Sequence, residues 1–262
     1  MTSLLILGLV IWLAYTTQAM IGFGANIIAL SLGALLWPLE QLLPVVVALN
    51  LPSSGWLVWK YRHEVAWRVL LRSIAPLFGG GFVVGVLTGH FLQSQWLALG
   101  FGVLVTLIAG WELKQDHDQS REPRPVLSQV FLGLGGLTQG LYASGGPFVA
   151  YAVDRLGLSR ASFRATLLVV WLTANSLLLA SFAAAEKLDA AFVQHLIYFL
   201  PLIVLGLWCG EQLHNRVSEK SFRRGLYLVL LLAGIILIIR NWPSSVSYTQ
   251  LRAHETSLHL VC

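Results

Sequence analysis

Long stretches without a single charged residue restrict the fold of this sequence more than any other feature. A soluble domain has about 25% charged residues, whereas only 11% of this chain is charged and 56% is hydrophobic. Uncharged runs of this kind are typical of helices that cross a hydrocarbon core of about 30 Å. The sequence therefore predicts an all-α polytopic membrane protein. The predicted spans are 42–59, 73–96, 97–111, 165–185, 190–210 and 225–239, with a polar turn at 90–95.

The basic residues indicate how these spans are oriented. Four clusters of Lys and Arg alternate with links that are almost free of them, and the positive-inside rule places such clusters in the cytoplasm. The net charge of +5 therefore reports orientation in a lipid bilayer and does not indicate a nucleic-acid partner. We expect a multi-pass protein of the cell membrane. The clusters are Lys60, Arg62, Arg68 and Arg72; Lys114, Arg121 and Arg124; Arg155, Arg160 and Arg164; and Arg216, Lys220, Arg223 and Arg224.

Two glycine-containing interruptions within apolar sequence match each other. The first reads QAMIGFGANIIA at 18–29, and the second reads QGLYASGGPFVA at 139–150, an offset of 121. Because the loops at 112–125 and 154–164 are both predicted inside, the second interruption is expected to be the tip of a hairpin that enters and leaves on one side. We predict a re-entrant or broken helical hairpin in each half. The arms of the first hairpin are expected to have about 15 residues each, or roughly 22 Å, and the second arm of the second hairpin about nine residues.

The match continues beyond the hairpins at an offset of 125. Each half then holds one hairpin and three spans, an odd number of crossings, so the second copy is expected to be inverted relative to the first. The predicted division is a first membrane repeat at 1–112, a cytoplasmic linker at 113–125, a second membrane repeat at 126–241 and a polar tail at 242–262, to which no role is assigned. The matching pairs are Gln18 and Gln139, Gly24 and Gly145, Asn26 and Pro147, Asn50 and Asn175, Pro76 and Pro201, Gly81 and Gly206, and Gly85 and Gly210.

The interruptions predict a site for a small anion. A helix broken inside a bilayer frees backbone groups that lipid cannot satisfy, so the break must be buried in protein or line a cavity. The helix that restarts after it presents N–H groups and a partial positive charge, which favour an anion. All twelve Asp and Glu residues lie at span ends or in loops, which disfavours a metal, a Na⁺ site or a proton pump. We therefore predict no metal and no cofactor.

Some of these small residues have a simpler interpretation. Closely spaced glycines often only let membrane helices pack together, and this is the interpretation we favour for Gly79, Gly80, Gly81 and Gly85. Asn50 and Asn175 could bind a ligand or join two helices by a hydrogen bond. Arg164, at the start of a span, could offer a charge to an anion from the cytoplasmic side or anchor the helix at the interface.

The paired pattern also resembles a known family. In each half a Gly-rich break is followed by an apolar arm and then by a polar residue one helix later. This pattern, the chain length and the basic central loop resemble the TauE/SafE sulfite exporter family over residues 3–241. The family's breaks typically read G-x-G-G-G with a later Pro, and GFGAN and ASGGPF depart from that. The resemblance implies a bacterial inner-membrane permease for sulfite, sulfonates or related organosulfur acids. It also implies that the following residues line the substrate site: Gly22, Gly24, Asn26, Ser144, Gly145, Gly146 and Pro147.

The predicted function is that of a secondary transporter, without catalytic residues, that moves a small sulfur oxyanion or organosulfonate by alternating access. Its site is expected between the two hairpin tips. A passive anion channel on the same scaffold is the alternative. An intramembrane hydrolase with Ser144 and His195 is disfavoured, because Tyr142 replaces the first glycine of G-x-S-G and no orienting acid is evident. The predicted substrate-binding residues are Gln18, Gly22, Phe23, Gly24, Asn26, Asn50, Gln139, Tyr142, Ser144, Gly145, Gly146, Pro147, Arg164 and Asn175.

Overall fold

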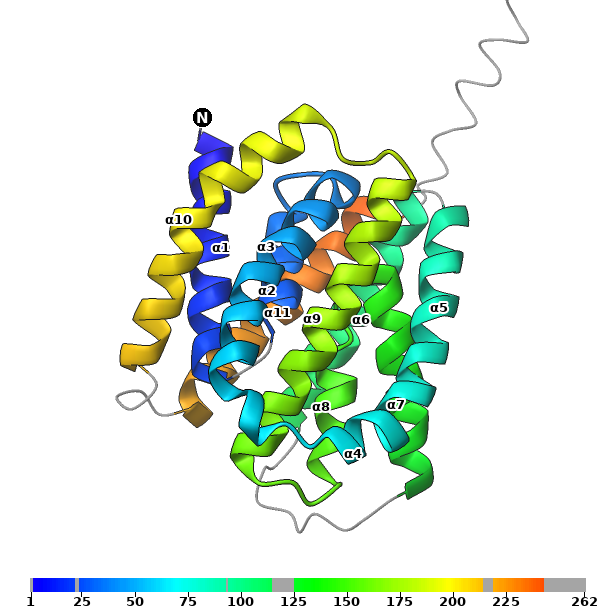
Figure 1. Ribbon diagram of the computed structural model, residues 1–262. Coiled ribbons are helices and arrows are strands. Elements are labelled where there is room, and N and C mark those ends of the chain that lie inside the picture. The colour runs from blue at the N-terminus through cyan, green and yellow to red at the C-terminus, as the bar shows by residue number, and fades with distance from the viewer. Residues whose placement is uncertain (1, 22–23, 93, 115–124, 214–218, 243–262) are drawn as a thin grey trace, which may run out of the picture.

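The computed structural model describes residues 2–21, 24–92, 94–114, 125–213 and 219–242, and within these ranges it contains helices and no strand (Figure 1). The all-α prediction is confirmed. The α-helices are α1 (Thr2–Ile21), α2 (Ala25–Gly33), α3 (Leu39–Tyr61), α4 (Trp67–Val69), α5 (Ala75–Phe91), α6 (Ser94–Lys114), α7 (Pro125–Tyr142), α8 (Gly146–Asp154), α9 (Arg160–Ala184), α10 (Ala190–Leu213) and α11 (Glu219–Asn241). A 3₁₀ turn at Arg62–Glu64 follows α3, and a π-helical turn at Leu70–Ile74 joins α4 to α5.

Within the described ranges, five helical segments are long and apolar enough to cross a membrane. They are Leu39–Glu64, Trp67–Gly89, Gln95–Lys114, Ala161–Ala184 and Ala190–Leu213, and they correspond to the first five predicted spans. The sixth predicted span lies in α11, whose apolar part is the shorter segment Tyr227–Asn241. The helix α6 continues to Lys114.

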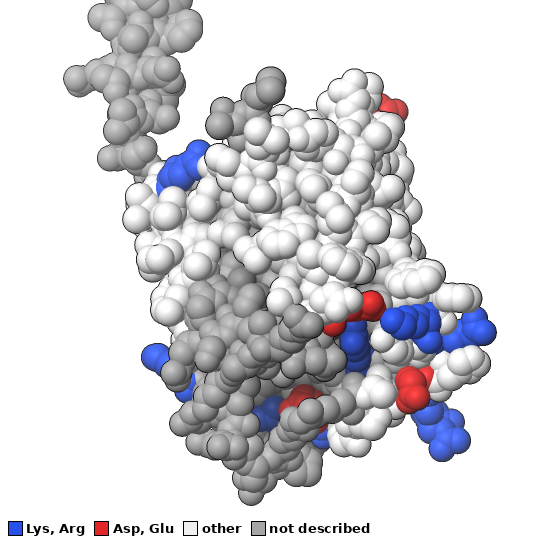
Figure 2. Space-filling view, turned by 90° about the vertical axis from the view of Figure 1, so that its left-hand side faces the viewer, with Lys and Arg blue, Asp and Glu red and all other residues white. Residues whose placement is uncertain are grey.

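The basic residues gather toward one end of the helical bundle. The chain leaves α3 and enters α9 at the lower end of the bundle in Figure 1. Figure 2 shows one face of the molecule, on which most of the Lys and Arg atoms lie in the lower half. At this end Lys60 Nζ on α3 lies 3.1 Å from Glu211 Oε1 on α10. For the clusters within the described residues, at 60–72 and 155–164, the arrangement agrees with a shared cytoplasmic side.

Both predicted hairpins are present, but their arms are unequal. In the first, α1 has 20 residues and α2 has nine; in the second, α7 has 18 and α8 has nine. The nine-residue second arm of the second hairpin was predicted correctly, whereas the two arms of about 15 residues in the first hairpin were wrong. The short arm has a local cause: Pro38 disfavours a helical conformation at the residue before it, so α2 ends at Gly33 and a turn leads to Pro38, which caps α3.

At two of the main helix–helix interfaces, a helix from one half of the chain packs against a helix from the other half. The helix α5 of the first half packs along α7 of the second, and α10 of the second half packs along α1 of the first. The helices α3 and α9 pack on each other, as do α6 and α11. The hairpin tips are thereby enclosed near α3 and α9.

Glycines allow α5 and α7 to approach closely. A Cβ atom at Gly81 would meet the carbonyl oxygen of Gly133, and one at Gly85 would meet that of Leu137. The packing interpretation is therefore correct for Gly81 and Gly85. At Gly79 and Gly80 a Cβ atom would have nothing within 4 Å, so these two glycines are not needed for the contact.

Gly81→Ala is expected to destabilise the protein, because the new methyl group meets backbone that cannot rotate away. Overpacking of this kind costs about 1–3 kcal/mol. Gly80→Ala, on the next residue of the same helix, places the same methyl group in open space and is the matched control. Thermal unfolding in detergent should give a lower midpoint for Gly81→Ala and an unchanged or raised midpoint for Gly80→Ala. Equal midpoints would contradict the close approach of α5 and α7.

Candidate substrate site

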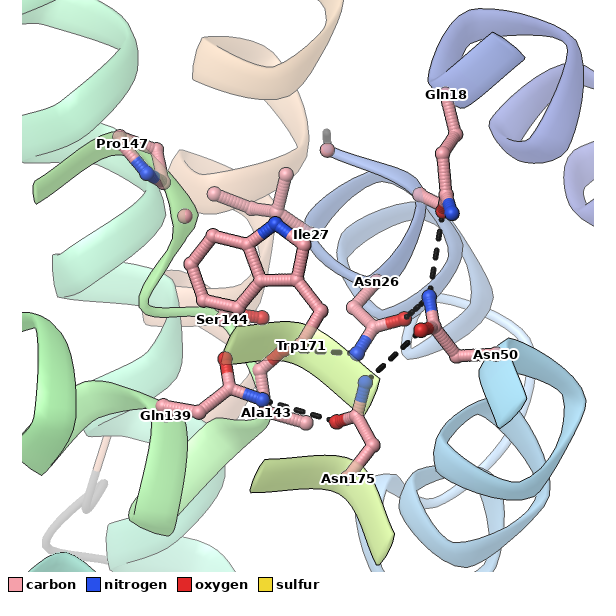
Figure 3. A pocket seen from close by; sticks show the side chains of 13 residues that line it. Gln18, Asn26, Ile27, Asn50, Gln139, Ala143, Ser144, Pro147, Trp171 and Asn175 are labelled. Carbon is pink, nitrogen blue, oxygen red and sulfur yellow. Dashed lines mark hydrogen bonds between the residues drawn. The ribbon is translucent and has the colours of Figure 1, made fainter. Parts of the chain in front are cut away.

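Asn50 lies at the centre of a buried network of side-chain amides. Its Nδ2 atom donates to Gln18 Oε1 at 3.2 Å and to Asn26 Oδ1 at 3.0 Å. Its Oδ1 atom accepts hydrogen bonds from Ser54 Oγ at 2.6 Å and from Asn175 Nδ2 at 2.9 Å. Figure 3 shows Asn26, Asn50 and Asn175 pointing toward one another. The polar atoms of Asn50 therefore connect α1, α2, α3 and α9.

The network extends from Asn175 to the tip of the second hairpin. Gln139 Nε2 donates to Asn175 Oδ1 at 2.9 Å, and Gln139 Oε1 accepts from the backbone N–H of Gly145 at 3.0 Å. Asn26 Nδ2, in the first tip, donates to the carbonyl oxygen of Ala143, in the second tip, at 3.0 Å. The amides of this network are hydrogen-bonded to one another and to the backbone of the second tip, and such networks hold their members in one arrangement.

The backbone at each tip adopts a left-handed conformation at one residue. Gly24 has φ 99° and Ala143 has φ 51°. A left-handed non-glycine residue costs about 1–3 kcal/mol and persists only where its surroundings hold it. At Ala143 the conformation coincides with the hydrogen bond from Asn26. The turn thus directs a carbonyl of one half toward an amide of the other.

A small cavity lies between the two tips, as Figure 3 shows. Its volume is about 30 Å³, which exceeds the roughly 10–15 Å³ that a single water molecule needs. Both α2 and α8 begin at this cavity. The N–H groups of a helix's first turn have no partner within that helix, and in α8 the lining residue Pro147 has no N–H. The lining residues are Gln18, Gly24, Ala25, Asn26, Ile27, Asn50, Gln139, Ala143, Ser144, Gly146, Pro147, Trp171 and Asn175.

The lining is polar but carries no formal charge. It contains five amide side chains and one hydroxyl from the buried polar residues, together with apolar groups. The part of the chain that the structure describes holds no group of three His, Cys, Asp or Glu residues that could bind a metal ion. The groups at the cavity that favour an anion are therefore two helix N-termini and neutral donors.

The family follows from sequence comparison. Residues 7–237 match the family described as sulfite exporter TauE/SafE, which is most of the chain. The chain belongs to the TauE/SafE family. It is 27% identical over 204 residues to a "Probable inner membrane transporter protein TsaS" of Comamonas testosteroni, covering 76% of this chain and 83% of that protein. No solved structure shows significant similarity to it.

As a member of the TauE/SafE family, the chain is a multi-pass transporter of the cell membrane, as the uncharged runs and the resemblance predicted. The structure brings together nine of the fourteen residues that we predicted to bind substrate. They are Gln18, Gly24, Asn26, Asn50, Gln139, Ser144, Gly146, Pro147 and Asn175. Gly22 and Phe23 lie outside the described residues.

Three predicted site residues lie beside the cavity without lining it. The ring of Tyr142 packs on Phe101, with 5.3 Å between ring centroids. Gly145 faces α7, where a Cβ atom would meet the carbonyl oxygen of Gly135. Arg164 donates to the carbonyl oxygen of Ala19 at 3.3 Å and lies over the ring of Tyr61, so its charge is placed at the C-terminal turn of α1, where a cation is favourable.

The side chains considered for a hydrolase have other partners. Ser144 Oγ donates to the carbonyl oxygen of Tyr142 at 2.9 Å. The ring of His195 contacts Trp37 edge-on at 4.6 Å and Phe199 at 6.4 Å. Neither contact provides a base for the hydroxyl group, and the family is one of transporters.

Sequence reasoning missed four lining residues: Ala25, Ile27, Ala143 and Trp171. The first three are apolar neighbours of residues that were predicted. Trp171 could have been found from Asn175, because residues four apart lie on the same face of a helix.

Proposed function

We propose that this TauE/SafE protein is a secondary transporter of a small sulfur oxyanion or organosulfonate, such as sulfite or sulfoacetate, and that the ligand binds between the two hairpin tips. One observation carries the proposal: two helices from different halves of the chain begin at the same cavity. The amides of both halves surround it, and no formal charge of either sign lines it.

The electrostatics of the cavity favour an anion with a single charge. Each helix N-terminus is equivalent to roughly half an elementary charge, so two of them balance about one negative charge. A dianion would leave uncompensated charge in a buried place, which is costly. We therefore propose a monoanionic oxyanion, such as a sulfonate or hydrogen sulfite, rather than sulfate.

The size of the cavity supports a transport cycle with more than one state. The cavity, of about 30 Å³, holds only a few water molecules and is small for sulfur with three oxygens, so we propose that the tips move apart when the ligand binds. The exchange of α5 and α10 between the halves and the sequence matches at offsets of 121 and 125 support two inverted repeats. Such repeats alternate access by rocking about a site at the middle of the membrane.

Reconstituted protein should take up a singly charged sulfonate in a saturable manner. Proteoliposomes would be loaded with buffer, and the uptake of labelled methanesulfonate, sulfite, taurine and sulfate would be compared with that of protein-free liposomes. We expect methanesulfonate and hydrogen sulfite to compete, and sulfate and zwitterionic taurine to compete poorly. A folded sample that neither binds nor moves any small anion would contradict the proposal, and unitary currents far above carrier turnover would identify a channel.

A further inference from the structure

We infer that Trp171 is the residue by which the site distinguishes an oxyanion with three oxygens from one with two, through a hydrogen bond donated by its indole N–H. This inference rests on the proposed function. The residue comes from α9, lines the cavity and is 7% exposed. Figure 3 shows its ring among the side chains of both tips.

The indole N–H of Trp171 is buried and has no hydrogen-bond partner among the described residues. A buried donor without an acceptor costs about 1–3 kcal/mol, and such groups in a native structure call for an explanation. Three other buried polar atoms share this property within the described ranges, Tyr15 Oη, Arg155 Nε and Arg164 Nε. None of these three residues lines the cavity, whereas Trp171 does.

The position of the ring is held by its packing. Phe78 of α5 meets the Trp171 ring edge-on, with 6.3 Å between the centroids and 71° between the planes. Asn175, one turn further along α9, is fixed by its hydrogen bonds to Gln139 and Asn50. A donor held in this way loses little conformational entropy when an acceptor arrives.

Three helices then offer donors to one ligand. The first turn of α2 supplies backbone N–H groups, α8 supplies the N–H of Gly146, since Pro147 has none, and α9 supplies the indole. A sulfonate or sulfite group carries three oxygens around sulfur, so each can meet a different donor, while a carboxylate has only two oxygens in one plane. A carboxylate would leave one buried donor unpaired, and sites of this kind reject such analogues strongly.

The two halves are not equivalent at this position. At the offset of 125 that matches Asn175 with Asn50, Trp171 corresponds to Val46, which has no donor and is fully buried. The third donor therefore comes from the second half alone. The preference for a sulfonate over a carboxylate is therefore assigned to Trp171 and can be removed by one substitution.

Methanesulfonate and acetate form a suitable pair of probes, because both are monoanions with a single methyl group. Binding to purified wild-type protein in detergent and to Trp171→Phe would be measured by calorimetry. We expect wild type to prefer methanesulfonate, and Trp171→Phe to bind it about ten- to hundredfold more weakly, as for a lost hydrogen bond to a charged group. Acetate affinity should change little. Trp208→Phe is the matched control, because Trp208 is 62% exposed on α10.

A second variant separates the N–H group from the shape of the ring. Position 171 carrying 3-benzothienylalanine keeps the bicyclic shape and lacks the donor, and it should reproduce the loss seen with Trp171→Phe. In wild type, the indole N–H resonance that disappears in Trp171→Phe should shift on addition of methanesulfonate. An unchanged preference in both variants would overturn the inference while leaving the transporter proposal in place. Failure of wild type to bind any anion would instead overturn the proposed function.

Discussion

Asn50→Asp is expected to abolish anion transport and also to lower stability, so uptake is compared in protein that is shown to be folded. The substitution preserves shape, but it replaces the Nδ2 donor to Gln18 and Asn26 with a second acceptor and adds a negative charge to the cavity wall. At an effective dielectric constant of about 20, a charge about 5 Å from a bound anion repels it by about 3 kcal/mol. This corresponds to a loss of more than about a hundredfold in affinity, which uptake into proteoliposomes at pH 7.5 would measure.

Asn241→Asp provides the matched control for that experiment. Asn241 is the last residue of α11, and its Nδ2 atom donates to the carbonyl oxygen of Leu237, away from the cavity. The same change of an amide to a carboxylate there should leave uptake within about twofold of wild type, as for a surface substitution. If folded Asn50→Asp transported anions at the wild-type rate, the ligand could not bind at the amide network.

Gln139→Leu and Gln18→Leu are expected to have unequal effects on stability, although the two residues occupy matching positions. Loss of Gln139 leaves both the N–H of Gly145 and Oδ1 of Asn175 without a partner, at about 1–3 kcal/mol each. Loss of Gln18 removes one acceptor from Asn50 Nδ2, which still donates to Asn26. Thermal unfolding should therefore place Gln139→Leu several degrees below Gln18→Leu.

Gln95→Leu tests whether the change of residue type alone lowers stability. Gln95 is exposed, and its Nε2 atom makes only a long contact of 3.4 Å with the carbonyl oxygen of Asn241. Its unfolding midpoint should match that of wild type. Equal midpoints for Gln139→Leu and Gln18→Leu would show that the hydrogen bonds of Gln139 do not stabilise the second tip.

The helices and the residues at the tips were predictable because the requirements for crossing a bilayer, an apolar run of sufficient length and paired backbone groups, can be read from short stretches of sequence. Uncharged runs identify spans, and a glycine break followed by an apolar arm identifies a hairpin. Repetition of the pattern pointed to Asn50 and Asn175 together, and the two side chains are joined by a hydrogen bond across 125 residues of sequence. Here the comparison of the two halves supplied information that neither half holds alone.

The remaining features depend on packing between distant segments. Trp171 looks like an ordinary apolar residue of a span until α2 and α8 are placed against it. The cation of Arg164 is directed to the carbonyl of Ala19 because α1 ends beside α9, which no pattern around residue 164 indicates. The unequal arms of the first hairpin depend on Pro38. The apolar run extends beyond Gly33, so its length alone indicated a longer second arm.

The amides of the site are linked in a single direction. Gly145 donates to Gln139, Gln139 to Asn175, Asn175 to Asn50, and Asn50 to Gln18. If one side chain in this row turned over by itself, two oxygens would face each other on one side and two NH₂ groups on the other. The row can therefore reverse only as a whole, and its fixed end at the backbone N–H of Gly145 opposes that reversal. The direction of donation is therefore a property of the whole row. It makes Asn175 the donor and Asn50 the acceptor, although the two asparagines occupy matching positions.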